Sequence, residues 1–112
     1  MVKKINIEEL KSKIDNKEDF YLIDALSENS FSARHIPGAK NVPNGPDYAE
    51  RFESVVGAPK DAEIITYCSS PTCMASVQAA DALEKAGYTN VGHYVGGLAE
   101  WQDADYGFEN AG

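Results

Sequence analysis

The sequence predicts an α/β fold in which a parallel sheet carries helices on both faces. Strand-like and helix-like segments alternate along the chain, as they do in a series of βαβ units. The strand-like segments are short apolar runs, which is typical of strands buried on both faces of a parallel sheet. The chain has 112 residues, enough for one domain with a single hydrophobic core. We therefore expect one domain over residues 1–112.

Helices are predicted where a capping residue precedes apolar residues at helical spacing. Asn6 and Glu9 have the spacing of a capping box, and Gly87 is placed to end an alanine-rich helix. Pro46 suits the first helical position, because its missing N–H would have no partner there in any case. On these signals we expect helices over residues 7–16, 27–33, 46–55 and 75–86, and a short helix after Gly96 and Gly97 that includes Leu98 and Trp101.

Strands are predicted at compact apolar runs. Residues 64–67, Ile-Ile-Thr-Tyr, are β-branched and aromatic and therefore suit a central strand. The other expected strands are residues 20–23, followed by Asp24, residues 40–42 and residues 91–95. The tail over residues 103–112 is acidic and polar, and we expect it to be loosely attached.

The chain is acidic, with a formal net charge of −8 and only two arginines, Arg34 and Arg51. Nucleic-acid binding needs a basic face, so we expect no nucleic-acid partner. No apolar run approaches the ~20 residues of a membrane span, and the N-terminus lacks the apolar core of a signal peptide. We therefore expect a cytoplasmic protein without membrane association. The sequence assigns no oligomeric state.

Both cysteines, Cys68 and Cys73, lie in the segment TYCSSPTCMAS, residues 66–76. Three interpretations are open: a disulfide, half of a metal site, or a nucleophile with a neighbouring thiol. Cytosolic thiols are usually kept reduced, which weighs against a permanent disulfide. A metal site would also need His35 or His93, and the spacing of the cysteines is long for zinc. We expect no metal and no cofactor.

The position of Cys68 favours the nucleophile. It directly follows the strand 64–67 and precedes the helix 75–86, and parallel sheets bind ligands beyond the carboxyl ends of their strands. A loop that wraps around the Cys68 sulfur would turn its backbone N–H groups inward as an anion cradle, reinforced by the start of the helix. Because an ordinary cysteine has a pKa of about 8.5, we expect these amides to lower the pKa of Cys68.

Four segments between Phe20 and Trp101 resemble the rhodanese-like family of single-domain sulfurtransferases. They are LID at 22–24, HIPGAKNVP at 35–43, the YC loop at 67–73 and AGYTNVGHYVGGLAEW at 86–101. The resemblance implies a rhodanese-like fold with a central five-stranded parallel sheet flanked by helices. It also implies a cysteine, here Cys68, that accepts a sulfane sulfur as a persulfide and passes it to a thiol, cyanide or partner protein.

Two positions depart from the family pattern. Many active members have arginine at the last position of the loop, where this chain has Cys73, and another arginine two residues after the aspartate of the second strand, where this chain has Leu26. Both changes remove positive charge from the usual thiosulfate site. The sulfur donor is therefore open among thiosulfate, polysulfide and persulfide.

The resemblance and the loop together assign site roles. We expect Cys68 to be the catalytic nucleophile and Cys73 to be a possible resolving thiol, which would attack a Cys68 persulfide and release sulfide. Asp24 and His35 are expected to support the site, whereas His93 is expected to be a packing or surface residue. The expected substrate contacts are Ser69, Ser70, Pro71, Thr72, Cys73 and Met74.

Three functions are compatible with these residues. The first is a sulfurtransferase with a small sulfur donor and a thiol or protein acceptor. The second is a phosphatase or arsenate reductase, but those enzymes need arginine at the sixth position after the nucleophile, where this chain has Met74. The third is a non-catalytic or redox-regulated sulfur carrier or sensor that uses the Cys68–Cys73 pair. The missing arginines favour it, and the presence of Cys68 opposes it.

Overall fold

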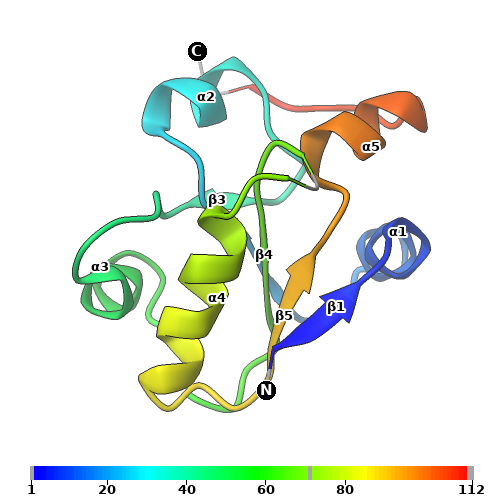
Figure 1. The fold of residues 1–112 in the computed structure, drawn as a ribbon. Coiled ribbons are helices and arrows are strands. Elements are labelled where there is room, and N and C mark those ends of the chain that lie inside the picture. The colour runs from blue at the N-terminus through cyan, green and yellow to red at the C-terminus, as the bar shows by residue number, and fades with distance from the viewer. Residues whose placement is uncertain (1, 71, 111–112) are drawn as a thin grey trace.

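A computed structural model describes residues 2–70 and 72–110 of the protein, and within them five parallel strands form one sheet (Figure 1). The order across the sheet is β1-β5-β4-β2-β3. The strands are β1 (Lys3–Ile5), β2 (Tyr21–Asp24), β3 (Lys40–Asn41), β4 (Ile64–Tyr67) and β5 (Val91–Tyr94). Every neighbouring pair is parallel. The predicted α/β class and five-stranded parallel sheet are therefore confirmed.

Helices cover both faces of the sheet, and each face has its own core. They are α1 (Ile7–Asp15), α2 (Glu28–Ala33), α3 (Tyr48–Val55), α4 (Ala75–Lys85) and α5 (Gly97–Asp103). One core includes Phe52 of α3 and Leu83 of α4, and the other includes Leu10 of α1 and Trp101 of α5. Figure 1 shows α3 and α4 on one side of the sheet and α1 on the other. No helix in the described residues is long and apolar enough to cross a membrane.

Local signals explain where most helices begin and end. The capping box of α1 is present, since Asn6 Oδ1 accepts from the Glu9 N–H at 2.8 Å and Glu9 Oε1 accepts from the Asn6 N–H at 3.5 Å. Gly87 ends α4 with a φ of 104°. The prediction for Pro46 was wrong, because α3 begins only at Tyr48. Asp47 precedes it with a φ of 57°, a left-handed conformation through which an α-helix does not continue.

Strand β1 was not expected from its own residues. It is three residues long, lies at the edge of the sheet beside β5 and buries only Ile5. Two exposed lysines, Lys3 and Lys4, precede Ile5 and hide the apolar signal on which strand prediction depends. Lysine on an edge strand also discourages pairing with a second sheet.

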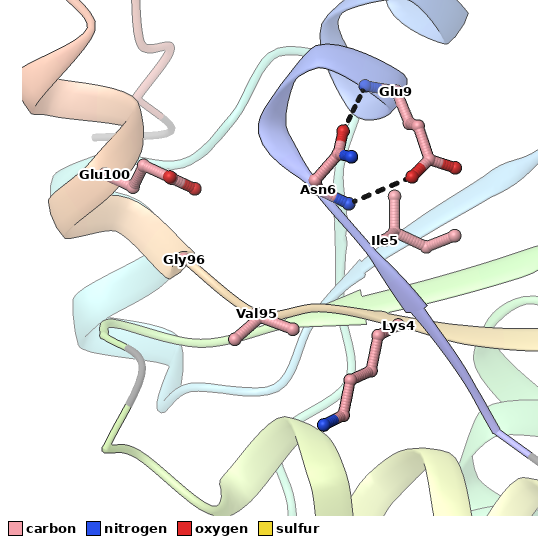
Figure 2. A pocket seen from close by; sticks show the side chains of 7 residues that line it. All are labelled: Lys4, Ile5, Asn6, Glu9, Val95, Gly96 and Glu100. Atoms are coloured by element: carbon pink, nitrogen blue, oxygen red, sulfur yellow. Dashed lines mark hydrogen bonds between the residues drawn. The ribbon is translucent and has the colours of Figure 1, made fainter.

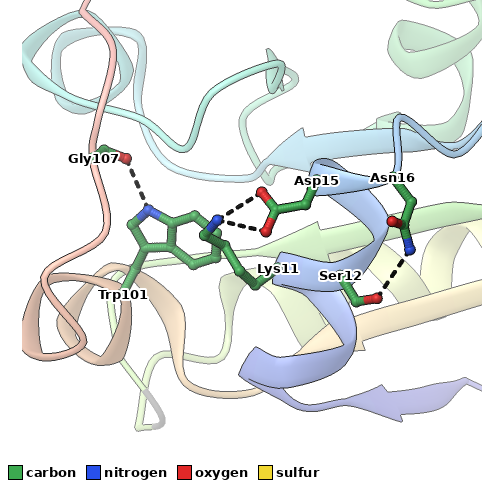
Figure 3. A network of polar contacts seen from close by, with 6 residues as sticks. All are labelled: Lys11, Ser12, Asp15, Asn16, Trp101 and Gly107. Atoms are coloured by element: carbon green, nitrogen blue, oxygen red, sulfur yellow. Dashed lines mark hydrogen bonds and ion pairs between the residues drawn. The ribbon is translucent and has the colours of Figure 1, made fainter.

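The described part of the acidic tail, residues 103–110, is held against the domain, whereas the sequence predicts a loose attachment. Trp101 Nε1 donates to the Gly107 carbonyl at 2.9 Å (Figure 3), and the Tyr106 ring packs edge-on against Trp101. Further along, Glu109 exchanges backbone hydrogen bonds with His35 at 2.8 and 2.9 Å. Figure 3 also shows Lys11 of α1 bonded to Asp15, and the Lys11 amino group lies over the Tyr106 ring.

Candidate active site

The loop between β4 and α4 lies at the carboxyl end of the central strand. All four residues of β4 are buried, and Cys68 follows the last of them directly. In Figure 1 this loop lies between the start of α4 and the start of α5. The topology thus places Cys68 where parallel sheets commonly bind ligands.

The start of α5 holds the first part of this loop. Leu98 N–H donates to the Cys68 carbonyl at 3.0 Å and Ala99 N–H donates to the Ser69 carbonyl at 2.9 Å. Gly97 packs so closely that a Cβ on it would lie 2.5 Å from the Cys68 carbonyl oxygen. Its φ of 66° also favours glycine. The contact between α5 and the loop therefore requires glycine at position 97.

The Cys68 side chain points into the molecule rather than into the mouth of the loop. Only 1% of its surface is exposed. Its thiol donates to the carbonyl of Cys73 at 3.3 Å, and its sulfur lies 3.3 Å from Ser76 Oγ. Both partners belong to the end of the loop and the first turn of α4, so Cys68 is held beneath the helix start.

This placement corrects the expectation that an amide cradle ionises Cys68. Burial raises the pKa of Cys68, and the neighbouring Cys73 thiol raises it further. The hydroxyl and the backbone N–H of Ser76 act in the opposite direction but do not outweigh burial. In this conformation burial therefore disfavours the Cys68 thiolate.

The loop hydrogen bonds that were expected around the Cys68 sulfur are made to Cys73 instead. Burial also opposes its ionisation, but hydrogen bonds from Cys68, from the N–H groups of Ala75 and Ser69 and from the Ser69 hydroxyl lower the pKa of Cys73 overall. Cys73 is half-buried, and both cysteines are free thiols. Of the two thiols, Cys73 is therefore the more acidic.

The remaining loop residues surround the mouth of the site. The Ser70 and Thr72 hydroxyls bond one another at 3.1 Å, and Ser69 and Thr72 are exposed. Met74 is 56% exposed, which is unusual for a large apolar side chain. Pro71 lies outside the described residues. These side chains are available to a ligand that approaches the loop.

Asp24 and His35 support the surroundings of the loop without a hydrogen bond to Cys68 in the described structure. Asp24 is fully buried at the end of β2, where its Oδ1 accepts from the Leu26 N–H at 2.8 Å. Burial raises the pKa of Asp24, and the bond from Leu26 partly opposes this. His35 stacks on Phe31 and its Nδ1 lies 2.8 Å from the Phe31 carbonyl oxygen.

Neither arginine is placed to replace the positive charge that the loop lacks. Arg34 bonds the Gln102 side chain and lies over the Phe108 ring. Arg51 donates to the carbonyls of Pro43 and Pro46. All these partners lie outside the loop.

Two site residues were missed at the sequence level. Ser76 is fully buried in the first turn of α4, with its Oγ between Cys68 Sγ and His93 Nδ1, 3.0 Å away. His93 lies on β5 and was taken for a packing or surface residue. A polar serine two residues into an otherwise apolar, alanine-rich helix face was the available signal for Ser76. His93 could be found only from the pairing of β4 with β5.

A separate cavity of about 400 Å³ lies beside α5 (Figure 2). Glu9 and Glu100 bring negative charge to its wall and Lys4 brings positive charge, but no member of the Cys68–Cys73 pair lines it. The lining residues are Lys4, Ile5, Asn6, Glu9, Val95, Gly96 and Glu100.

Comparison with known proteins agrees with this geometry. A family model described as the rhodanese-like domain matches residues 6–104. The chain belongs to the rhodanese-like family. The Bacillus subtilis protein YtwF, whose sulfurtransferase name is itself provisional, is 31% identical over 101 residues, which cover 90% of this chain and 91% of YtwF. A solved rhodanese-like domain from Anabaena is 27% identical, with a TM-score of 0.83 over 98% of this chain and 80% of the other.

Other relatives of this rhodanese-like chain are much longer. The adenylyltransferase/sulfurtransferase MoeZ of Mycobacterium tuberculosis is 29% identical over 93 residues, which cover 83% of this chain but only 23% of MoeZ. The chain therefore spans about a quarter of the length of such relatives.

Proposed function

We propose that the protein is a sulfurtransferase in which Cys68 takes up a sulfane sulfur as a persulfide and passes it to a thiol-type acceptor. The observation that carries this proposal is the position of Cys68, at the carboxyl end of the central strand in a rhodanese-like domain. Ser76 and Cys73 are the polar partners of its sulfur, and both can exchange a proton with it.

The reaction requires two displacements at sulfur. The Cys68 thiolate attacks the sulfane sulfur of the donor, the donor's own S–S bond breaks, and the leaving group departs with the electron pair. An acceptor thiolate then attacks the outer sulfur of the Cys68 persulfide, and Cys68 leaves as a thiolate. No external oxidant or reductant is needed. Because Cys68 is almost fully covered, a donor reaches it only when the side chain turns outward or the loop opens.

The lack of a local arginine favours persulfide or polysulfide donors over thiosulfate. Thiosulfate carries a sulfonate head that a bidentate arginine would hold well. Here both arginines bond elsewhere, and the chain carries a net charge of −8. We therefore expect polysulfide to load Cys68 faster than thiosulfate does at equal concentration.

Intact-mass spectrometry after incubation with thiosulfate or, separately, polysulfide tests the proposal. The expected product is the protein plus one sulfur atom, located on Cys68 by peptide mapping and removed by cyanide. Cys68→Ser is expected to fold and take up no sulfur, whereas the matched Cys73→Ser variant is expected to load. Equal uptake by the parent and Cys68→Ser would refute a Cys68 persulfide.

The contact between the two thiols favours a second candidate, a redox-regulated sulfur carrier. Cys73 is the more acidic sulfur and is hydrogen-bonded to Cys68, so it is suited to attack a Cys68 persulfide. That attack would form a Cys68–Cys73 disulfide and release hydrosulfide, after which an external thiol would be needed to restore the pair. A loss of two hydrogen masses after sulfur loading, in place of turnover to an acceptor, would support this candidate.

A further inference from the structure

A row of hydrogen-bonded side chains leads away from Cys68 on the side opposite the loop mouth. Its sulfur lies 3.3 Å from Ser76 Oγ, and Ser76 Oγ lies 3.0 Å from His93 Nδ1. Cys68 is 1% exposed and Ser76 is 0% exposed, whereas His93 at the end of the row is 9% exposed. The two displacement steps of the proposed sulfur transfer do not themselves assign a role to Ser76 or His93.

His93, at the far end of the row, is the member with the most exposed surface. Within residues 2–70 and 72–110, the buried side-chain polar atoms without a hydrogen-bond partner are Asp24 Oδ2 and Tyr48 OH. His93 Nε2 is not one of them, and the hydrogen bond of that ring is made by Nδ1. Of the two ring nitrogens, Nε2 is therefore the one left to exchange a proton with water, and 9% of the His93 surface is exposed.

Each member of the row is held in place by a different element. The Ser76 carbonyl accepts from Thr66 Oγ1 of β4 at 2.8 Å, so the first turn of α4 lies against the sheet. His93 of β5 pairs in register with Thr66 on one side and with Lys4 of β1 on the other. Residues in register on parallel strands project to the same face, so His93 lies beneath the start of α4.

We propose that Ser76 and His93 form a relay that carries the Cys68 proton between the buried sulfur and solvent, and that Ser76 then donates to the thiolate. Ser76 touches the reacting sulfur, whereas His93 acts through Ser76 and is a positioning residue. The relay rests on the proposed function of Cys68, because it supplies the thiolate that attacks the donor.

The proton transfers balance without an added reactant. The neutral His93 begins with its proton on Nε2, so Nδ1 accepts from Ser76. The single Cys68 S–H first turns from the Cys73 carbonyl, to which it donates in the described conformation, to Ser76 Oγ, which lies at the same distance of 3.3 Å. The thiol proton moves to Ser76, the Ser76 proton moves to Nδ1, and the Nε2 proton leaves to water. The result is a thiolate that accepts from Ser76, which in turn accepts from Nδ1–H. The reverse sequence protonates Cys68 when it leaves the persulfide.

Two charged or titratable groups act on the row. Burial lowers the pKa of His93, and the charge of Lys4 lowers it further. His93 is thereby kept neutral near neutral pH, as the relay requires, because an imidazolium has no lone pair to accept the proton. Cys73 faces Cys68 from the loop and offers a competing proton acceptor. The test must therefore remove Cys73.

The test uses the Cys73→Ser protein as the parent, so that Cys68 is the only thiol. Thiolate formation is followed by ultraviolet absorbance against pH, and reactivity by alkylation with iodoacetamide. Ser76→Ala is expected to raise the midpoint of the thiolate titration and to slow alkylation at neutral pH about tenfold, since a thiolate loses one charge-assisted hydrogen bond. His93→Phe is expected to shift the midpoint in the same direction by less.

Thr66→Val is the matched control. It removes a buried hydrogen bond to Ser76 but leaves the Ser76 hydroxyl between Cys68 and His93, so its alkylation rate is expected to stay within about twofold of the parent. A Thr66→Val effect as large as that of Ser76→Ala would mean that packing, not the hydroxyl, controls Cys68, and it would overturn the relay.

Nitrogen NMR of the His93 ring tests the relay without substitution of Cys68, Ser76 or His93. As pH rises through the Cys68 titration, the ring is expected to pass from the Nε2–H to the Nδ1–H tautomer while it remains neutral. An unchanged tautomer, or an unshifted Ser76→Ala midpoint, would refute the relay. A parent that shows both effects but takes up no sulfur would instead refute the sulfurtransferase and leave the relay intact.

Discussion

Cys68 and Cys73 lie in one short loop, yet their environments assign them different chemistry. Cys68 is buried beneath the start of α4, and burial raises its pKa. Cys73 is half-buried and collects the hydrogen bonds of the loop, which lower its pKa. In a persulfide, the nucleophile that can resolve the S–S bond is the nearby thiolate. The more acidic Cys73 is thus suited to that step, and Cys68 to carrying the sulfur.

Replacement of Cys73 is expected to separate sulfur uptake from sulfide release. Persulfide loading of Cys73→Ser is expected to match that of the parent, because Cys68 is retained. Sulfide release from the loaded protein is expected to fall about tenfold or more, since a neighbouring thiol reacts as if present at very high concentration. A sulfide-selective probe after loading measures the release rate. Indistinguishable rates for parent and variant would exclude a resolving role for Cys73.

Lys4 is expected to influence His93 from the edge of the sheet. In Figure 2 its side chain extends on the α4 side of the sheet, the face to which His93 belongs. Lys4→Gln removes a charge that lowers the pKa of His93, so the pKa is expected to rise, though burial will still hold it down. Proton NMR of the His93 ring against pH measures it. Lys3→Gln is the control, because Lys3 pairs with Gly92 and projects to the other face.

The element that fixes the loop is α5, although α5 contributes no side chain to the cysteine pair. Its first N–H groups bind the carbonyls of Cys68 and Ser69, and Gly97 allows the two backbones to approach. The N–H groups at a helix start have no partner within the helix, and here the loop supplies their acceptors. The loop and the helix start therefore complete each other's hydrogen bonding.

Gly97→Ala is expected to disrupt this junction. The new Cβ would lie 2.5 Å from the Cys68 carbonyl oxygen, and the left-handed φ adds strain, so we expect a loss of about 3 kcal/mol in the free energy of unfolding. Gly87→Ala is the matched control, because its φ is also positive but no atom lies within 4 Å of the added Cβ. We expect about 1 kcal/mol there.

Urea denaturation measures both glycine variants, and persulfide loading reports on the loop. Loading is expected to fall in Gly97→Ala under conditions where the variant is still folded. If the two variants lost equal stability, backbone strain alone would explain the effect. The close approach of α5 to the loop would then make no contribution to the loss.

At the scale of the whole molecule, the loop depends on two cores that meet across the sheet. The core under α3 and α4 fixes the helix that starts after the loop, and the core under α1 and α5 fixes the helix start that holds it. Asp24 lies fully buried between strand ends in this framework. Its titration is therefore expected to change the stability of the folded protein.

Asp24 is expected to make the protein less stable as pH rises. Its pKa is raised in the folded state, mainly by burial, so the folded protein binds more protons than the unfolded chain between the unfolded and folded pKa values. The favourable contribution is complete below the unfolded pKa and is lost as pH rises through the folded pKa. Urea midpoints between acidic and neutral pH, compared with Asp24→Asn, isolate it. Parallel pH profiles for the two proteins would contradict the expectation.

The sequence was sufficient for the architecture and for the loop. Apolar runs and capping patterns are local signals, and they located every helix and strand except β1, whose two exposed lysines carry no apolar pattern. Cys68 was located as a candidate nucleophile because it directly follows the predicted strand 64–67. These features depend on neighbours in the sequence, which is why they could be predicted.

The contacts of the sulfur atoms could not be predicted in the same way. Ser76 and His93 meet because β4 and β5 pair in one register and because α4 begins where it does. The direction of the Cys68 side chain depends on carbonyl and hydroxyl groups that only the folded loop brings together. The docked tail likewise follows from Trp101 meeting Gly107. Such features arise from tertiary geometry, which composition and periodicity do not encode.

Hydrogen bonds from α5 hold the carbonyls of Cys68 and Ser69, so the upstream half of the loop is held more firmly than the downstream half. The upstream half is held by main-chain hydrogen bonds from α5, whereas Thr72 and Met74 are exposed further downstream. Substitutions there could therefore alter which molecules are recognised without disturbing the thiol. Evolution of new partners would be expected to begin at those downstream positions.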